Sequence, residues 1–122
     1  MAAGCADNSI PEAQLPELDM SNPLLAAWDT PYETPPFSEI KLADYEPAFD
    51  AAIACSRAEV EAIVKNPKKP TFGNTIVALE RQGELLNRIS GLFFNLLEAD
   101  SSDEMQELSL IHISEPTRLR CI

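Results

Sequence analysis

The stretch from Pro70 to Asp100, PTFGNTIVALERQGELLNRISGLFFNLLEAD, constrains the fold more than any other part of this chain. Its large apolar side chains recur at three- and four-residue steps, which places them on one stripe of an α-helix. The spacing therefore predicts one long amphipathic helix over 70–100, whose apolar face another helix must cover. The predicted stripe consists of Ile76, Leu79, Leu86, Ile89, Phe93, Leu96 and Leu97.

Residues 42–65 predict the covering helix, because their apolar side chains follow the same period. Pro47 is tolerated only in the first turn of a helix, which puts the predicted start near Ala43 or Asp44. Cys55 sits one residue off the stripe and is interpreted as a small half-buried residue. The predicted stripe consists of Tyr45, Phe49, Ile53, Val60, Ile63 and Val64, with Ala48, Ala52 and Ser56 as small residues beside it.

The segment 66–70, NPKKP, predicts a turn between these two helices, since prolines at both of its ends interrupt helical backbone. Thr71 is the expected N-cap of the second helix, with Asn74 as its partner in a capping box. A short connection makes the helices antiparallel neighbours. The predicted fold class is therefore all-α: an antiparallel helical hairpin, followed by the start of a third helix at the Ser101–Glu104 capping box.

The segment 22–41 holds four prolines and three aromatic residues, which predicts an extended connection rather than a helix. Trp28, Tyr32 and Phe37 are the expected anchors of this segment on the helical surface, because aromatic side chains bury large areas. A proline-rich ligand for an SH3-like partner is the alternative, but the prolines do not form a regular P-x-x-P set.

Residues 1–21 predict a flexible leader, because they combine helix breakers with no apolar period. Ala2-Ala3-Gly4-Cys5 resembles the end of a bacterial lipoprotein signal, which would make Cys5 a candidate lipid anchor and the protein periplasmic. Met20 is the alternative start and would leave the protein cytoplasmic. The intact mass of the mature protein separates the two, since a diacylated Cys5 excludes a start at Met20.

The charge and hydropathy of the chain exclude several classes of function. Nine Lys and Arg against twenty Asp and Glu give a net charge of −11, which repels phosphate backbones and argues against nucleic-acid binding. The sequence contains no apolar run long enough for a membrane-spanning helix. Its three cysteines lie far apart, which indicates neither a disulfide framework nor a zinc knuckle.

Residues 108–118, LSLIHISEPTR, match the translation of a transposon-end sequencing adapter codon by codon. The last four residues then correspond to an index barcode and the constant sequence that follows it. Residues 108–122 are therefore interpreted as a non-native tail, and the native sequence after Glu107 is not known from this chain. A natural helix end is the alternative.

No catalytic or metal-binding motif can be assembled from the other residues. The single histidine, His112, lies in the suspected tail together with Cys121. Glu80 and Glu84 share a predicted helical face but lack a nucleophile or ligand partner, so they are interpreted as solvated surface. The pairs Glu84–Arg88 and Glu61–Lys65 are predicted as surface ion pairs.

Residues 22–107 nevertheless carry a string of short motifs in a characteristic order. They resemble the amino-terminal region of the bacterial peptidyl-dipeptidases, or dipeptidyl carboxypeptidases, which belong with oligopeptidase A and thimet oligopeptidase among the zinc metallopeptidases. Gly73 departs from the resemblance, because the family usually has glutamate there. The motifs are Asn22-Pro23-Leu24-Leu25, Trp28-Asp29-Thr30-Pro31, Thr34-Pro35-Pro36-Phe37, Ile40-Lys41, Tyr45-Glu46-Pro47-Ala48-Phe49, Thr71–Glu80 and Phe93-Phe94-Asn95-Leu96.

The resemblance implies a largely helical enzyme with two halves beside a channel that admits short peptides. In the family, the two histidines of a His-Glu-x-x-His motif and a further glutamate hold zinc, and the glutamate of the motif activates the zinc-bound water that attacks the scissile carbonyl. Those residues belong to the missing carboxy-terminal half, so no catalytic, cofactor-binding or metal residue is carried over to this chain. Residues 42–107 would correspond to helices of the non-catalytic half.

Two hypotheses follow. The first is an inactive amino-terminal fragment of a zinc metallopeptidase that cleaves short peptides, releasing carboxy-terminal dipeptides or cutting internally. The second is a complete helical-hairpin interaction module without enzymatic activity. The small core that two helices can form counts against the second hypothesis.

Overall fold

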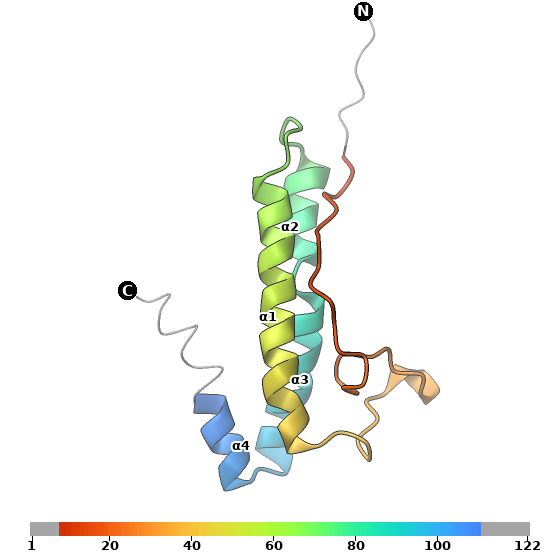
Figure 1. The fold of residues 1–122 in the computed structure, drawn as a ribbon, viewed down its shortest axis with the longest axis vertical. Helices are drawn as coiled ribbons and strands as arrows, with labels where there is room; N and C mark the ends of the chain where they lie inside the picture. The colour runs from red at the N-terminus through yellow and green to blue at the C-terminus, as the bar shows by residue number, and fades with distance from the viewer. Residues whose placement is uncertain (1–7, 111–122) are drawn as a thin grey trace, which may run out of the picture.

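The computed structural model describes residues 8–110, and within them every regular element is helical, which confirms the all-α fold class (Figure 1). A short 3-10 turn, η1, precedes the long helix α1. A π-helical turn, η2, runs directly into α2, and two further helices follow. The bounds are η1 Pro31–Glu33, α1 Leu42–Val64, η2 Phe72–Val77, α2 Ala78–Arg81, α3 Glu84–Ala99 and α4 Asp103–Leu108.

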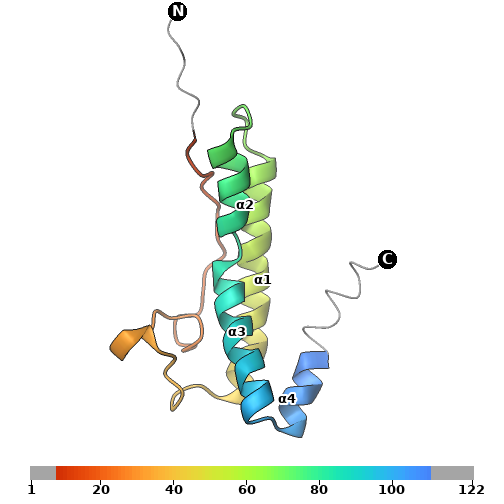
Figure 2. The same cartoon turned by 180° about the vertical axis from the view of Figure 1, so that it is seen from behind.

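The helices form the predicted antiparallel hairpin, in which α1 lies along α2 and α3 from both directions of view (Figures 1 and 2). The chain reverses at residues 65–71, as the prolines predicted. Thr71 caps η2 as expected: its hydroxyl accepts a hydrogen bond from the Asn74 N–H (3.1 Å), and its own N–H donates to Asn74 Oδ1 (2.8 Å). These reciprocal bonds satisfy backbone groups that a helix end leaves open.

The start of α1 differs from the prediction. Lys41 is the N-cap, and its N–H donates to the Asp44 carboxylate (2.7 Å), so the helix begins at Leu42. Pro47 therefore lies in the second turn rather than the first. Because proline has no N–H, the carbonyl of Ala43 cannot receive a helical hydrogen bond from it. Pro47 and Ala43 are both exposed, so water can bind the Ala43 carbonyl instead.

The prediction of one continuous helix over 70–100 is wrong, because the chain breaks at Gln82 and Gly83. Gln82 is extended (ψ 151°), and Gly83 has a left-handed backbone (φ 75°). Two side chains of α1 hold this break in place. Glu59 accepts a hydrogen bond from the Gly83 N–H (2.6 Å), and the Ser56 hydroxyl bonds the Gln82 side chain (2.8 Å). The break separates α2 from α3, which follow one another along α1 (Figure 2).

The break also divides the predicted apolar stripe. Before it, Ile76 and Leu79 are half exposed (52% and 50%), and Asn74 and Ala78 are buried instead. After it, the predicted side chains of α3 do join the core or pack against it. The stripe of α1 is likewise correct only in its first half, because Val64 at its end is 77% exposed.

The core is centred on Phe93, which is fully buried. Its ring makes edge-to-face contacts with Tyr45 and Phe49 of α1, at centroid distances of 5.0 and 5.5 Å. Such aromatic pairs contribute about 0.5–1.5 kcal/mol beyond area burial. The hairpin is thus held mainly where α1 faces α3.

The segment 22–41 is not simply extended, as predicted, because it folds into a turn and then η1. Leu24 and Leu25 (0% and 6% exposed) are its anchors, together with Trp28, which packs against the core. The other two predicted anchors are wrong: Tyr32 is 98% exposed and Phe37 is 56% exposed. Two leucines in a turn therefore share with Trp28 the anchoring that was expected of three aromatic rings.

Helix α4 begins one residue later than its predicted capping box. Ser102 rather than Ser101 is the N-cap, and its hydroxyl accepts a hydrogen bond from the Met105 N–H (3.3 Å). Met105 is buried in the core, and Leu108 packs partly against it. Of the suspected tail, residues 111–122 lie outside the described part of the chain.

Residues 8–18 of the leader run beside the hairpin in Figure 1. Asn8 lies so close to Gly73 that a Cβ at position 73 would meet the Asn8 Cβ at 2.5 Å. A glutamate at position 73, as the family resemblance would have it, could not share this arrangement with the leader. The glycine and the path of the leader are therefore coupled in this chain.

Candidate functional site

The described residues do not form a metal centre. Protein zinc sites need three or four His, Cys, Asp or Glu ligands around one point. Across residues 8–110, no group of three or more such side chains is placed to hold a metal ion. The zinc that the family resemblance implies therefore has no fitting donor set among residues 8–110.

Cys55 is placed as a structural residue of α1. The thiol is buried, with 4% of the residue exposed. Burial, and secondarily the negative charge of Glu59, raises the pKa of Cys55. A nucleophilic cysteine needs the opposite shift, because the thiolate is the reactive form. Cys5, Cys121 and His112 lie outside the described residues.

The acidic residues of the hairpin either face water or hold backbone. Glu80 and Glu84 were predicted to share one helical face, but they lie on opposite sides of the break at Gly83, and both are exposed. Glu61 and Lys65 form the predicted pair at 3.3 Å, and both side chains are more than half exposed. An exposed pair of this kind contributes about 0.3–0.5 kcal/mol.

Arg88 was predicted to pair with Glu84 on the surface, and this prediction is wrong. Its guanidinium Nη2 donates to the carbonyl of Leu24 (3.1 Å), and the group lies 4.7 Å from the centre of the Trp28 ring. The Trp28 indole N–H in turn donates to the Pro23 carbonyl (3.0 Å). Arg88 therefore fastens the turn at residues 22–28 to α3.

Sequence reasoning missed this cluster because Arg88 and Leu24 are 64 positions apart. An Arg four residues after a Glu on a helix favours the local ion pair, and nothing in the spacing marks a more distant partner. The aromatic residue at position 28 was the one available signal, since arginine stacks on aromatic faces.

Two kinds of hollow lie on the hairpin. Grooves of ≈ 750 and ≈ 810 Å³ separate the leader from α1, and both include Glu61 in their lining. A cleft of ≈ 310 Å³ lies where α1, α3 and α4 meet, lined in part by Tyr45, Asp100 and Met105. Both kinds of hollow are lined by a mixture of polar and apolar side chains.

The comparisons with known proteins identify relatives of this chain. It is 46% identical over 88 residues to dipeptidyl carboxypeptidase of Salmonella typhimurium, which is 72% of this chain and 13% of that protein. The Escherichia coli dipeptidyl carboxypeptidase is 46% identical over 87 residues. Oligopeptidase A of Salmonella typhimurium is 34% identical over 88 residues, or 12% of its length.

No protein-family model and no solved structure matches the chain. The chain spans only 13% of the length of the dipeptidyl carboxypeptidases that it matches. The matched length is nevertheless close to that of residues 22–107, where the resemblance was found. Over 87 to 88 residues the chain is homologous to dipeptidyl carboxypeptidase and oligopeptidase A, which confirms the family resemblance drawn from its sequence.

Proposed function

We propose that residues 22–107 are a non-catalytic helical segment of a longer zinc peptidase that cleaves short peptides and releases carboxy-terminal dipeptides. The 46% identity to dipeptidyl carboxypeptidase over 88 residues carries this proposal. The helical hairpin supports a structural role, since partly buried hydrogen bonds, such as Gly83 to Glu59 and Arg88 to Leu24, connect its segments. Zinc and the residues that hold it would belong to the rest of the longer protein.

The first test is long-read resequencing of the source DNA across the codons for Glu107 and Leu108. We expect the reading frame to continue past Glu107 into several hundred codons that include His-Glu-x-x-His. A genome that encodes residues 108–122 followed by a stop codon would contradict this proposal. It would favour the hairpin as an interaction module, especially if the chain melts cooperatively as a monomer.

The second test compares the 122-residue chain with the longer protein on blocked and unblocked oligopeptides, with dipeptide release followed by mass spectrometry. The longer protein should release carboxy-terminal dipeptides and lose this activity when zinc is chelated. The 122-residue chain should show no zinc-dependent hydrolysis under the same conditions. Activity of the short chain would contradict its non-catalytic role, whereas internal cleavage by the long one would correct only the predicted product.

The location of the protein remains a prediction, since Cys5 lies outside the described residues. No helix within residues 8–110 is long and apolar enough to cross a bilayer. The relatives reported above come from bacteria. The mass of the mature amino terminus distinguishes the lipid-anchored periplasmic form from a cytoplasmic form that begins at Met20.

A further inference from the structure

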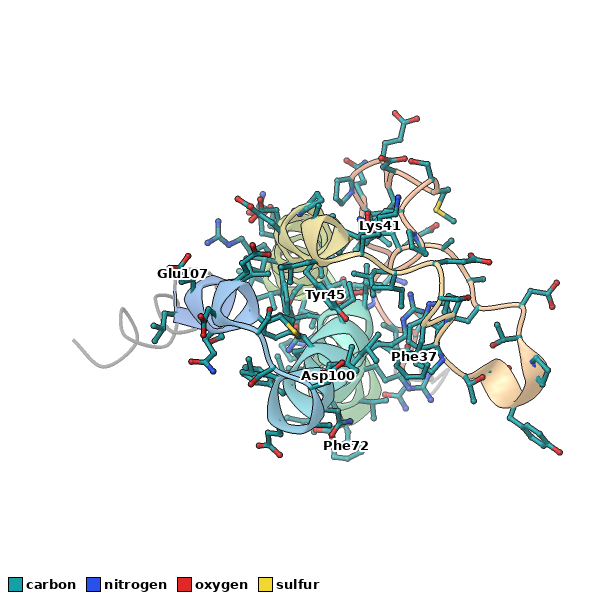
Figure 3. The ribbon with its side chains drawn as sticks, turned by 90° about the horizontal axis from the view of Figure 1, so that it is seen from below. Phe37, Lys41, Tyr45, Phe72, Asp100 and Glu107 are labelled. Atoms are coloured by element: carbon teal, nitrogen blue, oxygen red, sulfur yellow. The ribbon has the colours of Figure 1, made fainter. Side chains whose placement is uncertain are left out.

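Three large apolar side chains lie exposed on η2 and α2: Phe72 (72%), Ile76 (52%) and Leu79 (50%). Steps of four and three residues put them on one side of the helical turns. Phe72 points away from α1 in Figure 3, while Asn74 and Ala78, between them in sequence, are buried. We call Phe72, Ile76 and Leu79 the outer stripe.

The segment that carries the outer stripe is itself uncharged. Residues 70–79, PTFGNTIVAL, contain no charged side chain, although 24% of the whole chain is charged. A helix that keeps one face in water normally carries charged residues on that face. A contiguous exposed apolar patch of this kind marks an interaction site. The outer stripe is therefore built for contact with another surface.

We propose that the outer stripe docks against an apolar helical face in the remainder of the longer protein. This inference rests on the proposed function, in which the chain is one segment of that protein. The relatives extend far beyond the matched part, which is 13% of their length, so they hold ample chain to cover the stripe. A second copy is the less favourable occupant, because each chain carries a net charge of −11 and two copies repel each other.

Hydroxyl-radical footprinting read by mass spectrometry tests the docking without any substitution. Phe72, Ile76 and Leu79 should be labelled in the 122-residue chain and should lose that labelling in the longer protein. Persistent labelling of all three in the folded longer protein overturns the proposal. A reading frame that ends at Ile122 also overturns it, because no occupant then exists.

Paired substitutions provide an independent measurement. Ile76→Glu with Leu79→Glu should lower the Tm of the longer protein, since two charges would be buried at the docking surface. The same pair should leave the Tm of the 122-residue chain unchanged, because the outer stripe is exposed there. Val64→Glu is the matched control: Val64 is 77% exposed but lies on α1, outside the outer stripe, and its substitution should change neither Tm.

Two further outcomes separate the hypotheses. If the 122-residue chain forms a dimer that the Ile76→Glu and Leu79→Glu pair dissociates, a second copy covers the stripe and the proposal is wrong. A longer protein that protects the stripe but does not hydrolyse oligopeptides contradicts the proposed function alone. A working peptidase whose stripe stays labelled contradicts the docking alone.

Discussion

At the scale of single residues, the hydroxyl of Tyr45 is the clearest local cost in the core. The residue is 2% exposed, and its oxygen has no hydrogen-bond partner among the described atoms. A buried polar group without a partner costs about 1–3 kcal/mol. The ring itself stabilises the core, because it packs edge-to-face against Phe93.

Tyr45→Phe should therefore leave the free energy of unfolding unchanged or raise it by about 1 kcal/mol, measured by urea denaturation followed by circular dichroism. Tyr32→Phe is the control, since that hydroxyl belongs to a residue 98% exposed and its removal should have no effect. A loss of stability confined to Tyr45→Phe would mean that the hydroxyl has found a partner.

The same residue predicts a dependence on alkaline pH. Burial, and secondarily the charge of Asp44, raises the pKa of Tyr45 above its ordinary value. The folded state therefore holds the phenolic proton more tightly than the unfolded state. This contribution is complete below the unfolded pKa of about 10 and is lost as the pH rises through the folded pKa. Tyr45→Phe should show a smaller loss of stability above pH 10 than the unsubstituted chain.

Arg88 gives a prediction about the turn at residues 22–28. Arg88→Lys should lower the free energy of unfolding by about 1 kcal/mol, because lysine cannot reproduce both the planar stacking on Trp28 and the bond to Leu24. Trp28 is the single tryptophan, so its emission should shift to the red as the indole gains water. Arg81→Lys, at an exposed position of α2, is the control. Equal effects of the two substitutions would contradict the role assigned to Arg88.

At the scale of elements, the break between α2 and α3 depends on one glycine. Gly83 has a φ of 75°, where a side chain costs about 1–2 kcal/mol. A Cβ there would meet only the Ser56 hydroxyl at 3.5 Å, so the cost comes from the backbone rather than from a clash. Gly91, in the middle of α3, has nothing within 4 Å of where its Cβ would be.

The same substitution at these two glycines should therefore have opposite effects. Gly83→Ala should destabilise the chain by about 1 kcal/mol, whereas Gly91→Ala should stabilise it by about 0.5–1 kcal/mol through helix propensity. Chemical denaturation of both variants checks the pair. If Gly83→Ala also stabilises, residues 70–100 form the continuous helix that the apolar spacing predicts.

The elements also show where sequence reasoning reaches its limit. The hairpin, the cap at Thr71 and the core positions Phe49 and Phe93 could be predicted, because period and capping are local signals. The break could not, since the apolar spacing runs straight through it. Besides Gly83 itself, the break is held by Glu59 and Ser56, which lie more than twenty positions away in the chain.

At the candidate site, too, local signals could be predicted from the sequence and contacts between distant residues could not. The family resemblance could be drawn from short motifs in the sequence, and the relatives confirm it. The role of Arg88 was missed because the local pairing with Glu84 competes with a contact that exists only after folding. The outer stripe was missed for a related reason: Ile76 and Leu79 continue the period of the core residues, and only the break turns them outward.

At the scale of the whole molecule, the charge of −11 predicts how stability responds to salt. Twenty acidic side chains stand against nine basic ones, and the ion pair Glu61–Lys65 is exposed to water. Screening therefore removes little attraction but much repulsion. The Tm of the 122-residue chain should rise when NaCl is increased from about 10 mM, where the Debye length is about 30 Å, to about 1 M, where it is about 3 Å.

A control separates charge screening from effects of the salt on the solvent. It compares the Tm in sodium sulfate with the Tm in sodium chloride at equal ionic strength. Similar shifts with the two salts indicate charge screening, whereas a larger shift with sulfate alone indicates exclusion from the protein surface. A Tm that falls with NaCl would mean that attractive ion pairs outweigh the repulsion.

The bond between Arg88 and the Leu24 carbonyl also has a consequence for the order of folding. The hairpin closes progressively from its turn, beginning with contacts such as the Gly83–Glu59 bond across 24 positions, whereas the Arg88–Leu24 bond closes a loop of 64 positions. Closing a longer loop costs more entropy, so local contacts form faster than distant ones. Helical signal should therefore develop first in a refolding experiment. The fluorescence of Trp28 should change last, when the turn at residues 22–28 reaches the finished hairpin.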